Sequence, residues 1–260
     1  MISPKPRFAA PASLREALAL SYQHKRAVRW FAGAAELIAV DYSRVPSDAF
    51  IVDARCIPEI TQLSIDSSVR FGAFLPRAAL PASGALREIG ALGAASWSLA
   101  QLCALDARLV LISEGELRDV ELLKLCAGPE FAGIAPYELP LHIVFVRPGP
   151  HAALIERRRT TKDGAASFDQ RVVVSLALAA GGRTAHVRIL AHLMGVALVR
   201  VRAAEACLQH VKPSKEIAAQ AAREAAKLFV ASDRHSSAAL RALPPMILAA
   251  LNAAIDCAQR

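Results

Sequence analysis

The sequence contains little cysteine, and what it has follows no metal-binding or disulfide pattern. Five cysteines are scattered through 260 residues, and no two of them form a C-x-x-C pair. An odd, scattered set predicts neither a disulfide framework nor a zinc or iron–sulfur site, so we expect free, buried thiols. The five positions are Cys56, Cys103, Cys126, Cys207 and Cys257.

Long apolar runs are missing as well. Hydrophobic residues make up 54% of the chain, a share inflated by alanine, but no uninterrupted run reaches the roughly 18–20 residues that span a bilayer. The most apolar stretch near the end, Ala242–Ile255, contains Pro244, Pro245 and Asn252 and predicts a core or interface helix. Residues 1–7 lack the basic region, apolar block and cleavage site of a secretory signal. We therefore expect no membrane span and a cytoplasmic location.

Aromatic residues are few, at 5% of the chain, whereas the formal net charge is +8, from 31 basic and 23 acidic residues. A basic chain invites nucleic acid as a partner. Single-strand binding, however, uses aromatic side chains among the cations, and the densest basic cluster, Arg157–Arg159, has none. An acidic partner subunit or a dinucleotide accounts for the charge equally well, so we expect no nucleic acid. For the three arginines we favour a solvated strand end over contact with phosphates or an acidic partner.

Catalytic constellations are also absent from the sequence. No Ser-His-Asp, Cys-His or paired-carboxylate arrangement has the spacing of a hydrolytic site. His142, His186 and His192 lie in apolar or strand contexts without a second ligand at metal spacing. Asp53 and Asp106 lie beside turns, where capping explains them more simply than catalysis. We therefore predict no catalytic residue and no metal site.

What is present is a sequence of short helix and strand patterns. Ser13 and Glu16 have the spacing of a capping box that begins a helix, which we expect to run to about His24. Strands follow at Val28–Ala32 and Phe50–Asp53. Residues 1–55 are therefore expected to form a small N-terminal α/β subdomain.

The middle of the chain mixes strands and helices. A hairpin is expected from Thr61–Ile65 and Val69–Ala73, a helix at Trp97–Ala104, and strands at Leu105–Ile112 and His142–Val146. The prolines at 148 and 150 mark the preferred boundary with the last domain. Residues 56–148 are therefore expected to form an α+β middle domain.

The last part of the chain, residues 149–260, predicts an antiparallel sheet with a helical bundle. Gly181 and Gly182 are expected to form a two-residue hairpin turn between two of its strands. The last helix is expected to be bent or broken near Pro244 and Pro245. The strands are predicted at Ala153–Arg158, Val172–Ala179 and Thr184–Leu190, and the helices at Ala203–His210, Ser214–Val230 and Ser236–Cys257. The fold class is α+β.

The stretch Trp30–Val40 is the clearest candidate for a ligand site. It reads as an apolar strand that runs into a turn of small residues, where backbone N–H groups can approach an anionic group such as a pyrophosphate. The alternative is a tight turn packed with alanines, because one glycine is weak evidence for a phosphate cradle. Both interpretations stay open at this point.

Several segments, taken in order, match the motifs of one family. Ser13–Leu18 is similar to an opening S-L-x-E-A-L helix, Ala32–Leu37 stands where the family has A-G-G-T-D-L, and Ile51–Ile60 is similar to L-V-D-L-x-x-I-P-E-L. Further similar segments are Val69–Ala73, Ala104–Leu111, Val120–Val146 with Ile134–Leu139 in it, and Val172–Cys207 with Arg202–Ala206 near its end. The ordered set resembles the FAD-binding (medium) subunit of molybdenum hydroxylases, the family of xanthine dehydrogenase and carbon monoxide dehydrogenase.

The resemblance implies a flavoprotein subunit that binds FAD and passes electrons from an iron–sulfur partner to an external acceptor. It implies two partners, an iron–sulfur small subunit and a molybdopterin large subunit, and it makes residues 1–55 and 56–148 the FAD-type subdomains. The cofactor-binding residues would be Ala32, Gly33, Ala34, Ala35, Glu36 and Leu37 in a first loop, Gly93, Ala94 and Ala95 in a second loop, and Ile134 near the flavin ring.

The sequence departs from the family at both loops. In the first, the second glycine is Ala34 and the family's polar residue is Ala35. In the second, the family's asparagine and acidic residues have no counterpart around Gly93–Ala95. These losses support a second hypothesis, in which a scaffold subunit of the same fold has lost FAD and serves only in complex assembly. Flavin content separates the two hypotheses.

Overall fold

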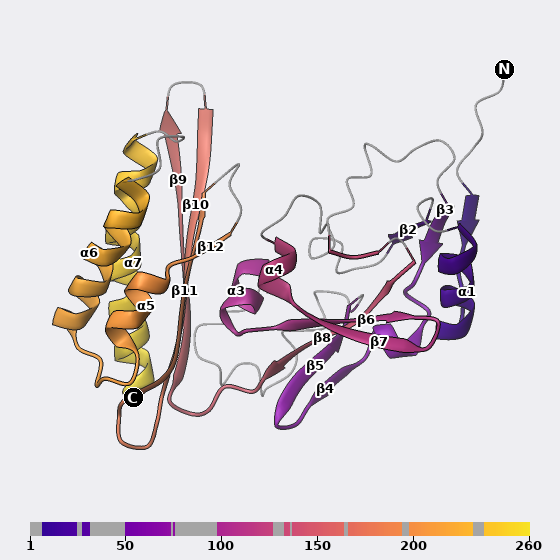
Figure 1. The fold of residues 1–260 in the computed structure, drawn as a ribbon, viewed down its shortest axis with the longest axis horizontal. Helices are drawn as coiled ribbons and strands as arrows, with labels where there is room; N and C mark the ends of the chain where they lie inside the picture. The colour runs from indigo at the N-terminus through magenta and orange to yellow at the C-terminus, as the bar shows by residue number, and fades with distance from the viewer. Residues whose placement is uncertain are drawn as a thin grey trace. The chain divides into compact units, whose positions relative to one another are not determined.

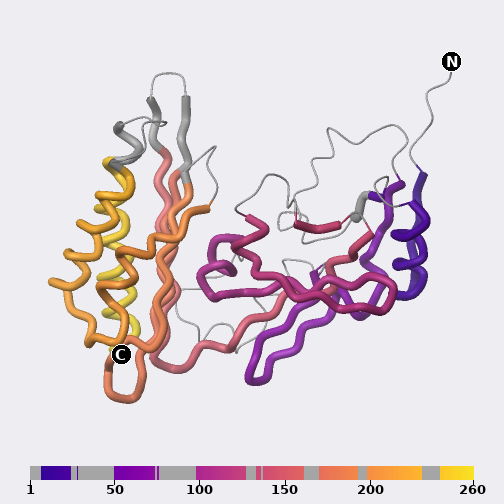
Figure 2. The backbone as a smooth tube through the Cα atoms, viewed as in Figure 1, coloured from indigo at the N-terminus to yellow at the C-terminus, as the bar shows by residue number. Residues whose placement is uncertain are grey.

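The computed structural model describes residues 7–24, 28–31, 50–73, 75, 98–126, 133–135, 137–163, 166–193, 198–230 and 237–260. The chain divides into two compact units, each described here by itself (Figures 1 and 2). Unit 1 comprises residues 1–83 and 106–147, and unit 2 comprises residues 84–105 and 148–260. The division into domains 1–55, 56–148 and 149–260 stays a prediction.

A three-stranded parallel sheet opens unit 1, in the order β1-β3-β2. At the start of its helix, Ser13 Oγ accepts a hydrogen bond from Glu16 N at 3.3 Å, and the Glu16 carboxylate accepts one from Ala12 N at 2.9 Å. The predicted cap is therefore confirmed. Val28, Phe50 and Val52 form a small buried core. The elements are β1 (Arg7–Ala9), α1 (Leu14–His24), β2 (Val28–Phe31) and β3 (Phe50–Asp53), and of these only β1 was not predicted.

A five-stranded antiparallel sheet forms the rest of unit 1, in the order β4-β5-β8-β6-β7. The predicted hairpin of β4 and β5 is present, whereas β6 begins later and β8 earlier than predicted. The strands are β4 (Leu63–Ile65), β5 (Ser68–Gly72), β6 (Arg108–Ser113), β7 (Glu116–Glu121) and β8 (Leu139–Val146). The short 3-10 helix η3 (Pro58–Ile60) precedes β4, and α4 (Leu122–Cys126) follows β7.

Two residues of this sheet show how local chemistry sets its geometry. Pro140 lies in β8 where the register with β6 shifts, and β5 pairs with β8 only from His142 onward. A residue without an N–H is tolerated at such a bulge. Gly72 lies against the backbone of η3, so that a Cβ at this position would overlap the carbonyl group of Ile60. The close approach of β5 to η3 therefore requires glycine.

Unit 2 contains a four-stranded antiparallel sheet, in the order β12-β11-β10-β9, with three helices on one face. The short helix α3 packs on the opposite face, where Ser98 Oγ lies 3.4 Å from the Glu156 carboxylate. The strands are β9 (Ala152–Asp163), β10 (Ala166–Leu178), β11 (Thr184–Leu193) and β12 (Val199–Arg200). The helices are α3 (Leu99–Ala104), α5 (Arg202–Leu208), α6 (Lys215–Val230) and α7 (Ser237–Ala258).

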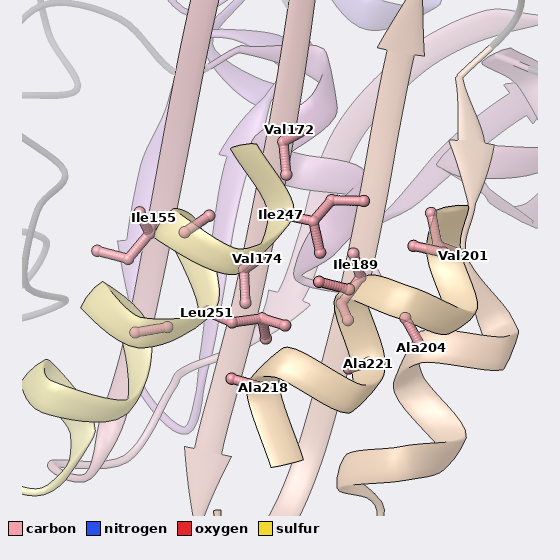
Figure 3. Packing of buried hydrophobic residues seen from close by; sticks show 14 of the residues in the cluster. Ile155, Val172, Val174, Ile189, Val201, Ala204, Ala218, Ala221, Ile247 and Leu251 are labelled. Atoms are coloured by element: carbon pink, nitrogen blue, oxygen red, sulfur yellow. The ribbon is translucent and has the colours of Figure 1, made fainter. Parts of the chain in front are cut away.

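Alternating strand residues and small helix residues build the core of unit 2. Val172, Val174 and Ile189 project from the sheet toward the helices, which face them with residues such as Ala221 and Leu251 (Figure 3). Side chains alternate between the two faces of a strand, so every second strand residue enters this core. The alanines allow the helices to approach one another and the sheet closely. The alanine that raises the hydrophobic fraction of the sequence is therefore used here for packing.

Two details of unit 2 differ from the prediction. The two-residue Gly-Gly turn is wrong, because Leu178 pairs with Thr184 and leaves a longer loop in which Gly182 alone of the two glycines has a positive φ, +71°. The last helix was expected to be bent or broken near its prolines; the break is wrong, because α7 runs through Pro244 and Pro245, while the bend stays a prediction. Each proline removes one N–H donor from the helix, but Leu243 and Ile247 on either side are fully buried in the core, which holds the helix together.

The structure thus confirms the α+β class, with the parallel N-terminal sheet, the mixed middle region and the C-terminal sheet with its helices. Within the described part of the chain, no helix has the length and apolar character needed to cross a membrane.

Candidate functional site

The parallel sheet of unit 1 presents the carboxyl ends of its strands at one edge. β2 ends at Phe31, which pairs with Asp53 at the end of β3. Ligands of open α/β sheets bind outside this edge. The first predicted loop begins one residue after Phe31. Ala32, Gly33, Ala34, Ala35, Glu36 and Leu37 lie outside the described residues, as do Gly93, Ala94 and Ala95, so the role of these nine positions stays a prediction.

Asp53 closes β3 at this edge by capping the turn that follows. Its Oδ1 accepts hydrogen bonds from Arg55 N at 3.1 Å and from Arg55 Nε at 2.9 Å, and its Oδ2 accepts one from Arg55 Nη2 at 2.7 Å. The hydrogen bonds from the Arg55 side chain lower the pKa of the Asp53 carboxyl. The carboxylate is therefore held in the turn-capping role that the sequence predicted.

Ile134 is the predicted site residue that the structure describes. It is partly buried and lines a hollow of about 530 Å³ in unit 1. Two segments form the hollow, the hairpin of β6 and β7 and the turn before β8. Leu117 and Tyr137 contribute exposed apolar surface to it, with 64% and 45% of their surface accessible. The lining residues are Ser113, Glu116, Leu117, Arg118, Gly133, Ile134, Ala135, Tyr137 and Glu138.

An ion pair fixes the turn that carries Ile134 and Tyr137. Arg118, on β7, donates from Nε to Glu138 Oε1 at 2.7 Å and from Nη2 to Glu138 Oε2 at 2.6 Å. The same Nη2 donates to the carbonyl of Gly133 at 2.7 Å, and Ala135 N donates to Glu138 Oε2 at 2.6 Å. The pairing is bidentate, which adds directional restraint to its electrostatic attraction. These hydrogen bonds hold the turn that forms one wall of the hollow against β7.

The charge state of this pair follows from its surroundings. Burial raises the pKa of the Glu138 carboxyl, but the hydrogen bonds from Arg118 and Ala135 and the Arg118 charge outweigh it, so the pKa lies below its ordinary value. The hydrogen bond to Glu138 in turn raises the pKa of Arg118. At a pH above the ordinary carboxyl pKa, Glu138 is ionised and makes its full contribution to stability. This contribution is lost as the pH falls through the lowered pKa.

The sequence did not predict the Arg118–Glu138 pair. The two residues are 20 positions apart, and their meeting depends on the register of β7 and on the path of the turn. One signal was present in the sequence: Glu138 directly precedes the apolar segment that forms β8. In the structure only 8% of its surface is accessible. A carboxylate in that position requires a partner.

The hollow has both apolar and charged side chains in its lining. Its volume lies within the range of about 300–1,000 Å³ found for ligand pockets. Its lining combines the apolar surface of Leu117, Ile134 and Tyr137 with the charged Glu116 and the Arg118–Glu138 ion pair. Among the residues that the structure describes, no three His, Cys, Asp or Glu side chains cluster in a way that could hold a metal ion.

Comparisons with known proteins show which solved structures share this fold. No family model matches the chain, and no curated protein matches it by sequence. A chain of carbon monoxide dehydrogenase from Hydrogenophaga pseudoflava is similar in structure, with a TM-score of 0.78, 22% identity and coverage of 99% of both chains. A chain of quinoline 2-oxidoreductase from Pseudomonas putida 86 has a TM-score of 0.75 at 20% identity over 100% of both chains. A chain of CO dehydrogenase from Oligotropha carboxidovorans has a TM-score of 0.74 at 20% identity, covering 100% of this chain and 99% of that one. The chain therefore shares its fold, over its full length, with chains of these oxidoreductases.

Proposed function

We propose that this chain is the FAD-binding subunit of a molybdenum-hydroxylase-type complex. The proposal rests on the full-length likeness in fold to a chain of carbon monoxide dehydrogenase, at a TM-score of 0.78. The ordered sequence motifs support it from an independent direction. In this role the chain passes electrons from an iron–sulfur small subunit to an external acceptor, beside a molybdopterin large subunit, in the cytoplasm.

The residues of this chain have separate tasks in that role. FAD supplies the electron-transfer chemistry when bound, and the protein supplies binding and orientation. The loop from Ala32 to Leu37 offers backbone N–H groups to the pyrophosphate, and the segment Gly93–Ala95 adds a second set. Ile134 offers apolar contact to the flavin ring from the wall of the hollow.

The described residues fit such a group. The hollow provides a partly apolar wall, and the Arg118–Glu138 pair holds that wall in place while neutralising two of the charges that line it. With Ala34 in place of the family's glycine and Ala35 in place of its polar residue, the pyrophosphate would be bound by backbone groups alone, because an alanine still donates its N–H.

Flavin content tests the proposal. We expect the full chain, purified in its complex or incubated with FAD, to show flavin absorption at about one equivalent per chain. Gly33→Asp places a carboxylate in the predicted phosphate loop, and Ile134→Asp places one in the hollow, so both variants should lose most of the flavin. Leu228→Asp is the matched control, because Leu228 is an exposed apolar residue on α6, and it should keep its flavin.

A colourless wild-type chain within an active complex would contradict the proposal. It would support instead the scaffold subunit that has lost FAD. Equal flavin loss in the two site variants and in the Leu228→Asp control would show that the loss follows from reduced stability rather than from the site.

A further inference from the structure

The arginine cluster at Arg157–Arg159 lies on the outer strand of the unit 2 sheet. β9 is 12 residues long and stands at the end of the order β12-β11-β10-β9. In the described part of the chain it pairs with β10 alone. The cluster was expected at a solvated strand end; the structure places it within the strand, and residues 157–160 are all exposed.

Within the described residues, β9 has a neighbouring strand on one side only, where β10 lies. In an antiparallel ladder, every second residue directs its N–H and C=O away from the neighbouring strand. An outer strand of this length is a template for one more strand, which is the mode of recognition known as β-augmentation. β9 is about twice the usual strand length.

The three arginines are distributed over both faces of this edge. Arg157 pairs in register with Val172, and Arg159 with Gln170, so these two share one face of the sheet. Arg158 lies on the other face and donates from Nε to Glu156 Oε1 at 2.8 Å. A strand added beside β9 would therefore meet cationic side chains on both of its faces.

Charge decides which strand the edge can accept. Unit 2 contains 17 basic and nine acidic residues, so it carries the whole formal net charge of +8, while unit 1 has 14 of each. A second copy of β9 would place arginines near arginines, which is unfavourable across strands. An acidic strand would place carboxylates opposite them, which is favourable, and the basic unit would speed its approach.

We propose that the outer edge of β9 binds an extended acidic segment of a partner protein by strand addition, with Arg157 and Arg159 selecting its charge. The exposed stretch of residues 157–160 has no aromatic side chain on which a base could stack, which disfavours single-stranded nucleic acid. The proposal is independent of the flavin site, because the residues of β9 that carry it are not among the predicted cofactor-binding residues.

Peptide binding to the full chain tests this surface. The probe is a fluorescein-labelled peptide of alternating glutamate and valine, followed by fluorescence anisotropy. A second peptide of equal charge carries proline in place of valine, which removes half of the N–H donors and disfavours an added strand. We expect the first peptide to bind at low salt and to protect β9 amides from hydrogen exchange, and the second to bind at least about tenfold more weakly.

Matched charge reversals distinguish the effect of the β9 edge on binding from the effect of the overall charge. The double substitution Arg157→Glu and Arg159→Glu should weaken binding of the first peptide by at least about tenfold. The pair Arg223→Glu and Lys227→Glu changes the charge equally on the exposed surface of α6 and should alter binding by less than about twofold. If the first pair prevents folding, Arg157→Gln and Arg159→Gln serve in its place.

Three results would overturn the proposal. One is equal weakening by both charge reversals, another is equal binding of the proline peptide, and the third is tighter binding of an oligothymidine without protection of β9. Each would mean that the surface attracts anions in general. Flavin content should be the same in the β9 variants and the wild type, so this proposal and the flavoprotein proposal can fail separately.

Discussion

The two units of this chain obtain their structure in different ways. In unit 2, three helices cover one face of a single sheet, and many small residues share the packing, so that the core is a repeated pattern. In unit 1, the formal charges balance, and individual residues decide the geometry, such as Gly72 against η3 and Glu138 against Arg118. The described part of the candidate site, the hollow beside Ile134, lies in the unit whose shape depends on such single contacts. Single substitutions should therefore cause large losses of stability at a few positions of unit 1. In unit 2 the loss of stability should scale with the change in side-chain volume.

The largest effect is expected from Gly72→Ala in unit 1. The new Cβ would overlap the Ile60 carbonyl group and lie 2.5 Å from Thr61 N. All of these atoms belong to the backbone, so no flexible side chain can move aside. We expect a loss of at least about 4 kcal/mol, or failure of unit 1 to fold. Thermal unfolding of the full chain, followed by calorimetry, measures it.

Gly181→Ala in the turn of unit 2 is the control, because no atom lies within 4 Å of a Cβ at that position. It should change the free energy of unfolding by no more than about 0.5 kcal/mol. Similar melting of the two variants would show that β5 can move away from η3, and the comparison between the units would fail.

A smaller effect is expected from Ala221→Leu in unit 2. Ala221 is fully buried on α6, in the core of helices and sheet. A larger side chain there forces the helices apart, at a cost of about 1–3 kcal/mol. Denaturant unfolding measures the change. Ala206→Leu, at an exposed position of α5, makes the same change in size without entering the core. Equal stability of the two variants would contradict the close packing of α6.

The smallest effect is a dependence on pH at His142, in the central strand of unit 1. Burial lowers the pKa of the imidazole below its ordinary 6.5, the charge of Arg70 lowers it further, and Asp119 opposes the shift. The folded state thus favours neutral histidine. Its contribution to stability is complete above 6.5 and declines as the pH falls through the lowered pKa.

Denaturant unfolding at neutral and mildly acidic pH, with His142→Gln beside the wild type, measures this contribution. The variant should lose less stability on acidification than the wild type. His151→Gln replaces an exposed histidine of unit 2 and should follow the wild type. If His142→Gln loses as much stability on acidification as the wild type does, the acid sensitivity belongs to other groups.

Much of the architecture was predictable because periodicity and caps are local. The spacing of Ser13 and Glu16 located the start of α1, and alternation located the strands of unit 2. The misses have physical causes. β1 has three residues, too few for a pattern, and α7 continues through Pro244 and Pro245 because its flanks are buried. The likeness in fold to the oxidoreductase chains agrees with the family that the ordered motifs suggested.

The sequence by itself determined most helices, most strands, the α+β class and the position of Ile134 in a recognisable segment, since each depends on residues close together in the chain. Only the tertiary structure decided that Arg118 meets Glu138, that a hollow opens beside Ile134, and that the arginines of residues 157–159 lie on an outer strand. These features join segments far apart in the chain. They depend on strand register and sheet order, which local patterns do not encode.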